Sequence, residues 1–191
     1  MSTVTIFGKG NMGQAIAGVL ARGGADIQHI GQGSTAQIEG DIVILAVPYG
    51  ALAQIAADFG DQLDGRTVVD ITNPLDFETF DRLVVPVGSS AAAEFASAVP
   101  GARVLKAFNT TFAATLASGK VGGQALTTVL IAGDDAASKT QLSELITTAG
   151  LGAIDAGSLS RAHELEALGF LQLTLAASEK ITWTGGFGVI S

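Results

Sequence analysis

Short apolar segments rich in β-branched residues recur along the chain and alternate with segments of helical periodicity. Several are continuous apolar runs, which is typical of parallel strands that are covered on both faces. We expect strands at residues 3–7 (TVTIF), 26–30 (DIQHI), 41–48 (DIVILAVP), 67–72 (TVVDIT), 103–108 (RVLKAF), 127–132 (TTVLIA) and 152–156 (GAIDA).

The segment after the first strand has helical spacing: Met12, Ile16 and Leu20 share one face, and Gly23–Gly24 is a stop signal. Alternating strands and helices predict an α/β fold, a Rossmann-type doubly wound, mostly parallel sheet of about seven strands in the order 3-2-1-4-5-6, with a short C-terminal helical extension. We expect one domain over residues 1–191. Further helices are predicted at residues 49–59, 90–98, 136–148 and about 161–180.

The connection between the second and third strands is unusually short. It has only the ten residues 31–40, whereas a parallel crossover usually needs about a dozen or more. We therefore expect the usual helix to be reduced to a loop or a single turn.

Composition narrows the possible partners. The formal net charge of −8 argues against nucleic acid and anionic membrane surfaces, which require clustered Lys and Arg. The absence of cysteine excludes disulfides, thiolate metal sites and thiol nucleophiles, and no other metal-ligand cluster stands out. No apolar run approaches the roughly 18 residues of a membrane span, and no leader pattern precedes the first strand, so we expect a cytoplasmic protein.

The stretch GKGNMG lies between the first strand and the first helix. In that context Gly8 permits the tight turn, Gly10 lets the backbone approach a pyrophosphate, and Gly13 lets the helix pack on the strand. The helix N-terminus then offers free N–H groups to phosphate. The spacing predicts a dinucleotide site; the alternative is a glycine turn that serves helix packing alone.

The second strand lacks the feature typical of NAD sites. No Asp or Glu occurs from residue 27 to 38, where an acid would bind the ribose hydroxyls. We therefore expect NADP(H) rather than NAD(H), although no Lys or Arg occurs between Arg22 and Arg66. Lys9 is the nearest cation and is otherwise a solvated loop residue; Gln32, Ser34 and Thr35 are candidate hydrogen-bond partners of the ribose.

Polar residues follow the later strands, where ligands of parallel sheets bind. Tyr49 is a candidate to cover a ring face or an ordinary helix-start residue, and Asn73 is a nicotinamide partner or part of an Asn-Pro turn. After the fifth strand, the pocket candidates are Lys106, Asn109, Thr110 and Thr111; Asn109 and Thr110 could also cap a helix.

Motifs spread over nearly the whole chain resemble the deazaflavin-dependent NADP reductases, the group of coenzyme F420:NADP oxidoreductase and the reductase domain of the STEAP ferric reductases. The resemblance rests on TIFGKGNMG, VILAVPY, VVDITNPL, LKAFNTT and DAGSLSRAHELEALGFLQLTLA, in this order. It implies an NADP(H)-binding Rossmann domain, commonly dimeric, that transfers a hydride between nicotinamide and a flavin-type ring.

The resemblance also implies site residues. Family members often carry a basic pair where this chain has Gly31 and Gln32. The implied set is Gly8, Lys9, Gly10, Asn11 and Met12 at the phosphates, Gln32, Gly33 and Ser34 at the 2′-phosphate, and Ala46, Val47, Pro48, Tyr49, Asn73, Pro74 and Asn109 beside the nicotinamide. We also expect Gly31 among the cofactor-binding residues, and we expect the pocket candidates Lys106, Thr110 and Thr111 to bind the acceptor.

Hydride transfer between two rings needs proximity and orientation more than a proton donor. His29 lies in the second strand and His163 on the last helix, where we expect a surface residue. Lys106 is either a donor to a substrate carbonyl or a packed strand lysine, so no catalytic residue is assigned.

The expected function is an NADPH-dependent oxidoreductase that acts between nicotinamide and a flavin, deazaflavin or other small acceptor. The alternative is a non-catalytic NADP(H) sensor. The β-hydroxyacid dehydrogenases and pyrroline-carboxylate reductases have a similar first domain, but they need a helical second domain of about a hundred residues. Only about forty residues follow the last strand here.

The last helix carries apolar residues around more than one face, which a single apolar stripe would not require. We therefore expect a two-fold homodimer in which residues 158–191, including the tail at 183–190, pack against a partner. The alternative is that the same chain covers this surface. The residues are Leu165, Leu168, Phe170, Leu171, Leu173 and Leu175.

Overall fold

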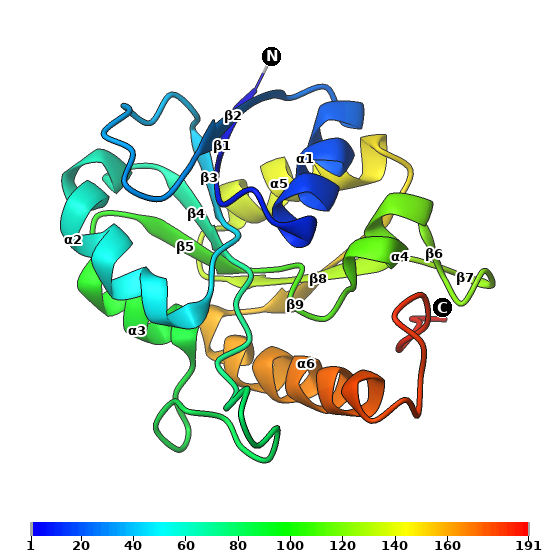
Figure 1. The fold of residues 1–191 in the computed structure, drawn as a ribbon. Helices are drawn as coiled ribbons and strands as arrows, with labels where there is room; N and C mark the ends of the chain where they lie inside the picture. The colour runs from blue at the N-terminus through cyan, green and yellow to red at the C-terminus, as the bar shows by residue number, and fades with distance from the viewer. Residues whose placement is uncertain (1, 191) are drawn as a thin grey trace.

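The computed structural model describes residues 2–190, which form one seven-stranded sheet and one separate hairpin (Figure 1). The strands are β1 (Thr3–Phe7), β2 (Asp26–Ile30), β3 (Ile42–Leu45), β4 (Thr67–Asp70), β5 (Arg103–Lys106), β6 (Lys120–Val121), β7 (Ala125–Leu126), β8 (Thr128–Gly133) and β9 (Gly152–Gly157). Their order across the sheet is β2-β1-β3-β4-β5-β8-β9, and β6 pairs with β7 alone.

Helices cover both faces of the sheet, which confirms the Rossmann-type doubly wound architecture (Figure 1). Leu20, Leu116 and Leu142, from α1, α4 and α5, are fully buried in one apolar core. Leu63 and Phe95, from α2 and α3, belong to the core on the other face. The helices are α1 (Asn11–Arg22), α2 (Leu52–Leu63), α3 (Ala91–Ala98), α4 (Ala113–Ser118), α5 (Ala136–Thr148) and α6 (Ala162–Ala177), with 3₁₀ turns at Tyr49–Ala51 and Leu159–Arg161.

The strand order differs from the expected 3-2-1-4-5-6, because β3 lies beside β1 and leaves β2 at the edge. As expected, residues 31–40 contain no helix. The short link instead returns directly across β1, where the Gly40 N–H donates to Thr5 Oγ1 at 2.9 Å. A Cβ on Gly40 would lie 2.5 Å from the Thr5 nitrogen. This close passage places β3 on the far side of β1.

The expectation of a parallel strand at residues 127–132 is also wrong, because β8 runs antiparallel to β5 with Leu105 opposite Gly133. The chain leaves β5 through the short helix α4, in the region where the sequence allowed a capped helix, and then through the β6–β7 hairpin, which the sequence patterns do not predict. These short elements do not carry the chain back across the sheet as a crossover helix would. β8 therefore begins at the end of the sheet where β5 finishes, and it runs in the opposite direction. The other five pairings in the sheet are parallel, so the sheet is mostly parallel.

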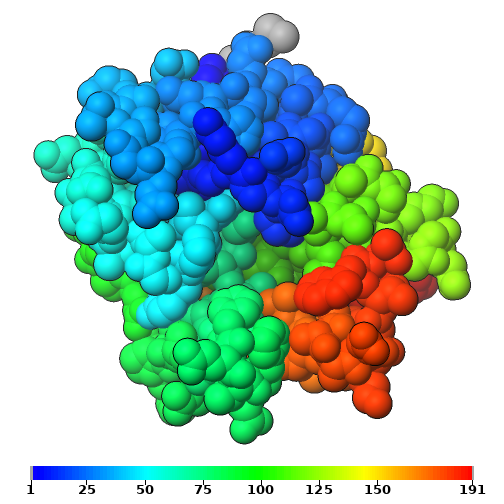
Figure 2. All heavy atoms as spheres, viewed as in Figure 1, coloured from blue at the N-terminus to red at the C-terminus, as the bar shows by residue number. Residues whose placement is uncertain are grey.

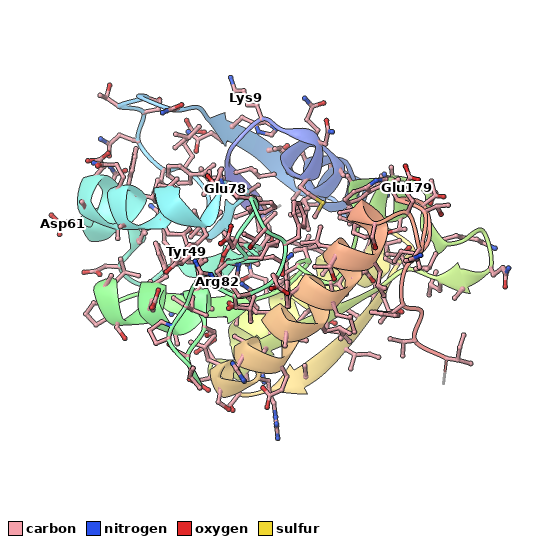
Figure 3. The ribbon with its side chains drawn as sticks, turned by 60° about the horizontal axis from the view of Figure 1, so that its bottom comes forward. Lys9, Tyr49, Asp61, Glu78, Arg82 and Glu179 are labelled. Atoms are coloured by element: carbon pink, nitrogen blue, oxygen red, sulfur yellow. The ribbon has the colours of Figure 1, made fainter. Side chains whose placement is uncertain are left out.

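Two segments outside the sheet border a hollow in the molecular surface. Figure 2 shows it between the blue N-terminal segment and the orange C-terminal segment. The loop after β4, which carries Glu78 and Arg82, lies on the same side of the molecule as α6 (Figure 3).

Within residues 2–190, no helix has the length and apolarity for crossing a bilayer, and no three His, Asp or Glu side chains gather as a metal site.

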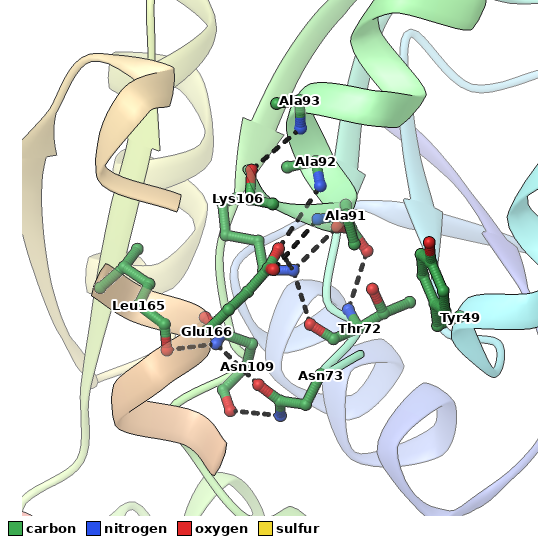
Figure 4. A network of polar contacts seen from close by, with 12 residues as sticks. Tyr49, Thr72, Asn73, Ala91, Ala92, Ala93, Lys106, Asn109, Leu165 and Glu166 are labelled. Carbon is green, nitrogen blue, oxygen red and sulfur yellow. Dashed lines mark hydrogen bonds and ion pairs between the residues drawn. The ribbon is translucent and has the colours of Figure 1, made fainter. Parts of the chain in front are cut away.

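A buried ion network joins the sheet to α6 (Figure 4). Lys106, the last residue of β5, is fully buried. Its Nζ donates to Asp70 Oδ2 at 2.8 Å, to the Thr72 carbonyl at 2.5 Å and to Glu166 Oε1 at 2.7 Å. All three donors of the ammonium are therefore used inside the protein, as expected of a packed strand lysine.

Glu166 extends the network to α3. Its carboxylate accepts from the Ala91 N–H at 3.0 Å and from the Ala92 N–H at 3.4 Å, at the first turn of that helix. Burial raises the pKa of Glu166, while the Lys106 ammonium opposes this shift. One cation thus holds β4, β5, α3 and α6 together.

We predict that Lys106→Met destabilises the protein by about 3–5 kcal/mol, because it leaves Asp70 and Glu166 buried without their cation. Without the cation, the pKa of one carboxyl in the folded variant rises, because this carboxyl is stable there only when protonated. Since protonation becomes less favourable as the pH rises, the loss of stability grows from about pH 5 to pH 8. Urea unfolding at several pH values measures this. The control is Lys139→Met, which breaks a pair with the exposed Asp155 and costs about 1 kcal/mol or less. Equal, pH-independent losses in the two variants would contradict the account.

Candidate dinucleotide site and adjoining cavity

The turn between β1 and α1 packs directly on the end of β3. Gly8 has a φ of 106°, and a Cβ there would lie 2.1 Å from the Ala46 carbonyl oxygen. A Cβ on Gly13 would lie 2.9 Å from the Gly8 oxygen. Nothing lies within 4 Å of the Cβ position of Gly10. Gly8 and Gly13 therefore serve close backbone packing, whereas Gly10 leaves its surface open to a ligand.

The N-terminus of α1 is prepared for an anion. Its N-cap residue is Gly10, which has an extended backbone and makes no side-chain cap hydrogen bond. The first turn holds no acidic residue. The N–H groups of this twelve-residue helix therefore point out of the turn without a capping side chain, as phosphate sites at helix N-termini require.

A cavity of about 770 Å³ lies on one side of this turn, which we call the β2-side cavity. It brings together Gly8, Lys9 and Gly10 with Gly31–Ser34 and Ala46–Pro48, all of them predicted site residues. Lys9 projects from the turn (Figure 3), and its Cε lies 4.0 Å from the Cβ position of Gly31. Lys9 is the only cation among the described residues that line this cavity. The carboxylate of Asp58, from α2, is the one acidic group in its lining.

A second cavity, of about 440 Å³, lies on the other side of the turn, and we call it the β4–β5 cavity. It begins at Asn11 and Met12, directly after Gly10, so the turn borders both cavities. Its lining includes five predicted residues, Asn11, Met12, Asn73, Asn109 and Thr111, and others from the start of α4, from α6 and from the C-terminal segment: Phe112, Ala113, Ala114, Leu173 and Trp183.

Asn73 and Asn109 form a paired amide at this cavity (Figure 4). Asn73 Nδ2 donates to the Asn109 carbonyl at 2.9 Å, and Asn109 Nδ2 donates to Asn73 Oδ1 at 2.9 Å and to the Leu165 carbonyl at 2.7 Å. These acceptors fix the orientation of the Asn109 amide and leave its Oδ1 buried without a partner. α6 comes close because Gly169 faces the pair: a Cβ there would lie 2.2 Å from Asn73 Oδ1.

Five predicted site residues line neither cavity: Thr35, Tyr49, Pro74, Lys106 and Thr110. The Tyr49 hydroxyl turns toward α3 and donates to Glu94 Oε2 at 2.6 Å. That bond and partial burial raise the pKa of Tyr49 to about 12. Lys106 lies below the surface with its donors occupied, which corrects the expectation that it faces the acceptor.

The histidines lie outside the β4–β5 cavity. His29 Nδ1 is 3.2 Å from the Gly8 carbonyl oxygen, on the β2 side of the turn. His163 is half-buried, and its Nδ1 is 3.0 Å from the Ser89 carbonyl oxygen.

Sequence reasoning assigned Trp183 and Leu173 to a dimer interface and did not predict them as cavity residues of their own chain. Leu173 is one of several leucines in α6, and helical periodicity does not separate a core leucine from one at a cavity. Trp183 is the only tryptophan of the chain and lies in a glycine-rich segment. A large aromatic residue that has no periodic pattern around it is the signal that was available.

No protein-family model matches the sequence. The chain is 34% identical over 131 residues to Metalloreductase STEAP3 of Rattus norvegicus, covering 67% of this chain and 25% of that protein. It is 28% identical over 172 residues to the F420-dependent NADP reductase of Methanocaldococcus jannaschii, covering 87% of this chain and 76% of that protein. The chain thus spans a quarter of the rat relative's length and about three quarters of the archaeal one's.

Solved structures share the fold. A protein of Arthrobacter sp. FB24, named as a candidate F420-dependent NADP reductase, has a TM-score of 0.85 at 23% identity, with all of both chains covered. The protein SMa0349 of Sinorhizobium meliloti has a TM-score of 0.70 at 29% identity, over 84% of this chain and 87% of that one. In sequence the chain therefore resembles the F420-dependent NADP reductases and the STEAP reductases, and it shares the fold of the solved structure from Arthrobacter.

Proposed function

We propose that the protein is an NADP(H)-dependent oxidoreductase that transfers a hydride between nicotinamide and a flavin, a deazaflavin or another small acceptor. The observation that carries the proposal is that two cavities meet at one glycine turn whose helix N-terminus has no capping side chain. A dinucleotide whose pyrophosphate lies on that turn would reach both cavities at once. The names of the rat and archaeal relatives support reductase activity.

The β2-side cavity fits the adenosine half of NADP(H). No acidic residue occurs from 27 to 38 to repel a 2′-phosphate, and Lys9 lies beside Gly31. Gln32 and Ser34 line the same cavity and offer hydrogen bonds. In this proposal, Lys9 contributes the cationic partner that a basic pair contributes elsewhere in the family.

The β4–β5 cavity fits the nicotinamide half and the acceptor. Asn109 Oδ1 is a buried acceptor without a partner, and a carboxamide N–H is the kind of donor it lacks. When bound, the nicotinamide supplies the hydride. The amide pair orients that ring, the backbone of the turn holds its phosphates, and the largely apolar lining of the cavity excludes water. Among the residues that the structure describes, no titratable side chain lines this cavity, which agrees with chemistry that needs no proton donor in the step itself.

A non-catalytic NADP(H) sensor is the competing function. It would use the same nucleotide site but would leave the β4–β5 cavity without an acceptor. Turnover with added acceptors separates the two functions.

Assembly as a homodimer through α6 is part of the proposal. Leu171 is 50% exposed, and the half-buried Leu168 and Leu175 lie on the same face of α6, three and four residues away. The described tail folds back onto its own chain, so this outer face of α6, rather than the tail, is the surface that we propose meets a second copy.

We predict that Lys9→Ala weakens NADPH binding by up to about 1.5–3 kcal/mol, the range of a hydrogen bond to a charged group, while NADH binding changes little. Isothermal titration with both nucleotides measures this. Lys180→Ala, at an exposed lysine beyond the end of α6, is the control and leaves both affinities unchanged. An equal loss for NADPH and NADH would show that Lys9 does not read the 2′-phosphate.

We predict that the protein oxidises NADPH with at least one ring acceptor, because the β4–β5 cavity has room beside the amide pair. Stopped-flow absorbance with flavin mononucleotide, riboflavin, coenzyme F420 and ferric chelates tests this. Asn109→Leu should slow the reaction, because it removes both the amide pair and the unpartnered oxygen. No oxidation with any acceptor, despite NADPH binding, would favour the sensor.

We predict a light-scattering mass near twice 19.2 kDa at micromolar concentration. Leu171→Glu should shift the mass toward a single chain, because it places a charge in an apolar contact. The exposed Val87, in the loop before α3, provides a control: Val87→Glu should leave the mass unchanged. A wild-type mass near 19.2 kDa would contradict the dimer.

A further inference from the structure

After α6, residues 181–190 turn back over the β6–β7 hairpin and the start of α4. The Gly122 N–H donates to the Thr184 carbonyl at 2.8 Å, and the Phe187 N–H donates to Gln172 Oε1 at 3.0 Å. A Cβ on Gly188 would lie 2.9 Å from the Ala125 Cβ, so the tail lies close against the hairpin. The tail is therefore held by defined contacts of its own chain.

Gln172 is the central anchor of this tail. Its side chain is buried, with 2% exposed, although it lies on a helix rich in leucine. Nε2 donates to the Thr110 carbonyl at 3.1 Å, and Oε1 accepts from the tail. The amide of Gln172 thus connects the tail to the segment after β5 that carries Asn109 and Thr111.

Trp183 is the residue that this anchoring brings to the β4–β5 cavity. Its indole packs against the Phe112 ring, with centroids 5.0 Å apart and planes inclined by 58°. The side chain is still 52% exposed, and it lines the cavity together with Leu173 and the two asparagines. A half-exposed indole at a cavity leaves a large apolar ring face free for a ligand.

We propose that Trp183 is a specificity-determining residue for the acceptor: its indole stacks on one face of a flat, fused aromatic ring in the β4–β5 cavity, and Gln172 is the positioning residue that holds it there. The inference rests on the proposed function and narrows the acceptor class to fused rings such as isoalloxazine and deazaisoalloxazine. Ferric chelates, which lack such a ring, gain nothing from this contact. Stacking of an aromatic side chain on a flat ring increases affinity about tenfold or more.

The single tryptophan makes the contact directly measurable. Riboflavin and 5-deazariboflavin are titrated into the protein saturated with NADP⁺, with emission corrected for absorption by free N-acetyltryptophanamide. We expect saturable quenching of Trp183 by both rings and none by ribitol, which carries the same side chain without the ring. In Gln172→Leu we expect red-shifted emission from a released tail and weaker ring binding.

Kinetics provides the second measurement. Trp183→Ala should raise the KM for riboflavin about tenfold or more, with the Kd for NADPH unchanged, and Trp183→Phe should restore most of the loss. Ile190→Ala, at an 84% exposed tail residue, is the control and keeps the wild-type KM.

The results separate this inference from the proposed function. Absent or unsaturable quenching, together with an unchanged KM in Trp183→Ala, overturns the assignment of Trp183 while NADPH oxidation would still support the reductase. Saturable quenching without any NADPH oxidation supports the ring contact and counts against the reductase.

Discussion

The ammonium group of Lys106 holds together the elements that form the β4–β5 cavity. It lies at the end of β5 and contacts Asp70, the Thr72 carbonyl and Glu166, so it connects two neighbouring strands to α6. Removing one partner from such a buried network leaves an uncompensated charge, which costs far more than an ordinary surface pair. Asn73 follows Asp70 in the chain, and Asn109 follows Lys106. α6 and its tail supply the opposing Gly169, Leu173 and Trp183.

The glycine turn sets the other boundary of the site. Gly8 and Gly13 bring β1, β3 and α1 within backbone contact distance. A Cβ atom at either position would force these elements apart. The turn separates one cavity that holds Lys9 from another that holds a neutral amide pair. This division suits a cofactor whose charged groups lie at one end and whose reactive ring lies at the other. The chemistry at the ring then depends on geometry, because the described part of the chain places no titratable side chain in the lining of the β4–β5 cavity.

Local patterns predicted much of this arrangement. Residues 3–13 form the expected strand, turn and helix, and residues 31–40 form the expected loop, because both follow from glycine positions and chain length. The expected strand order and the expected parallel direction of β8 were wrong. Both depend on which edge of the sheet a connection reaches, and the hydrophobic periodicity of a strand is the same at either edge. The roles of Tyr49 and Lys106 could not be read from strand ends alone. Their partners, Glu94 and Glu166, lie 45 and 60 residues away in the sequence.

The central claim is that the β4–β5 cavity brings a nicotinamide and an acceptor ring face to face, while the adenosine half of the dinucleotide lies across the glycine turn in the β2-side cavity. Isotope transfer tests it most directly, with NADPH deuterated on one or the other face of nicotinamide C4, 5-deazariboflavin as acceptor, and ordinary water as solvent. Because C5 of the deazaflavin is carbon, a deuteride that arrives there does not exchange. The account predicts that deuterium from one face only appears at C5, without hydrogen from water at that position. Deuterium lost to solvent, or transferred equally from both faces, would contradict it.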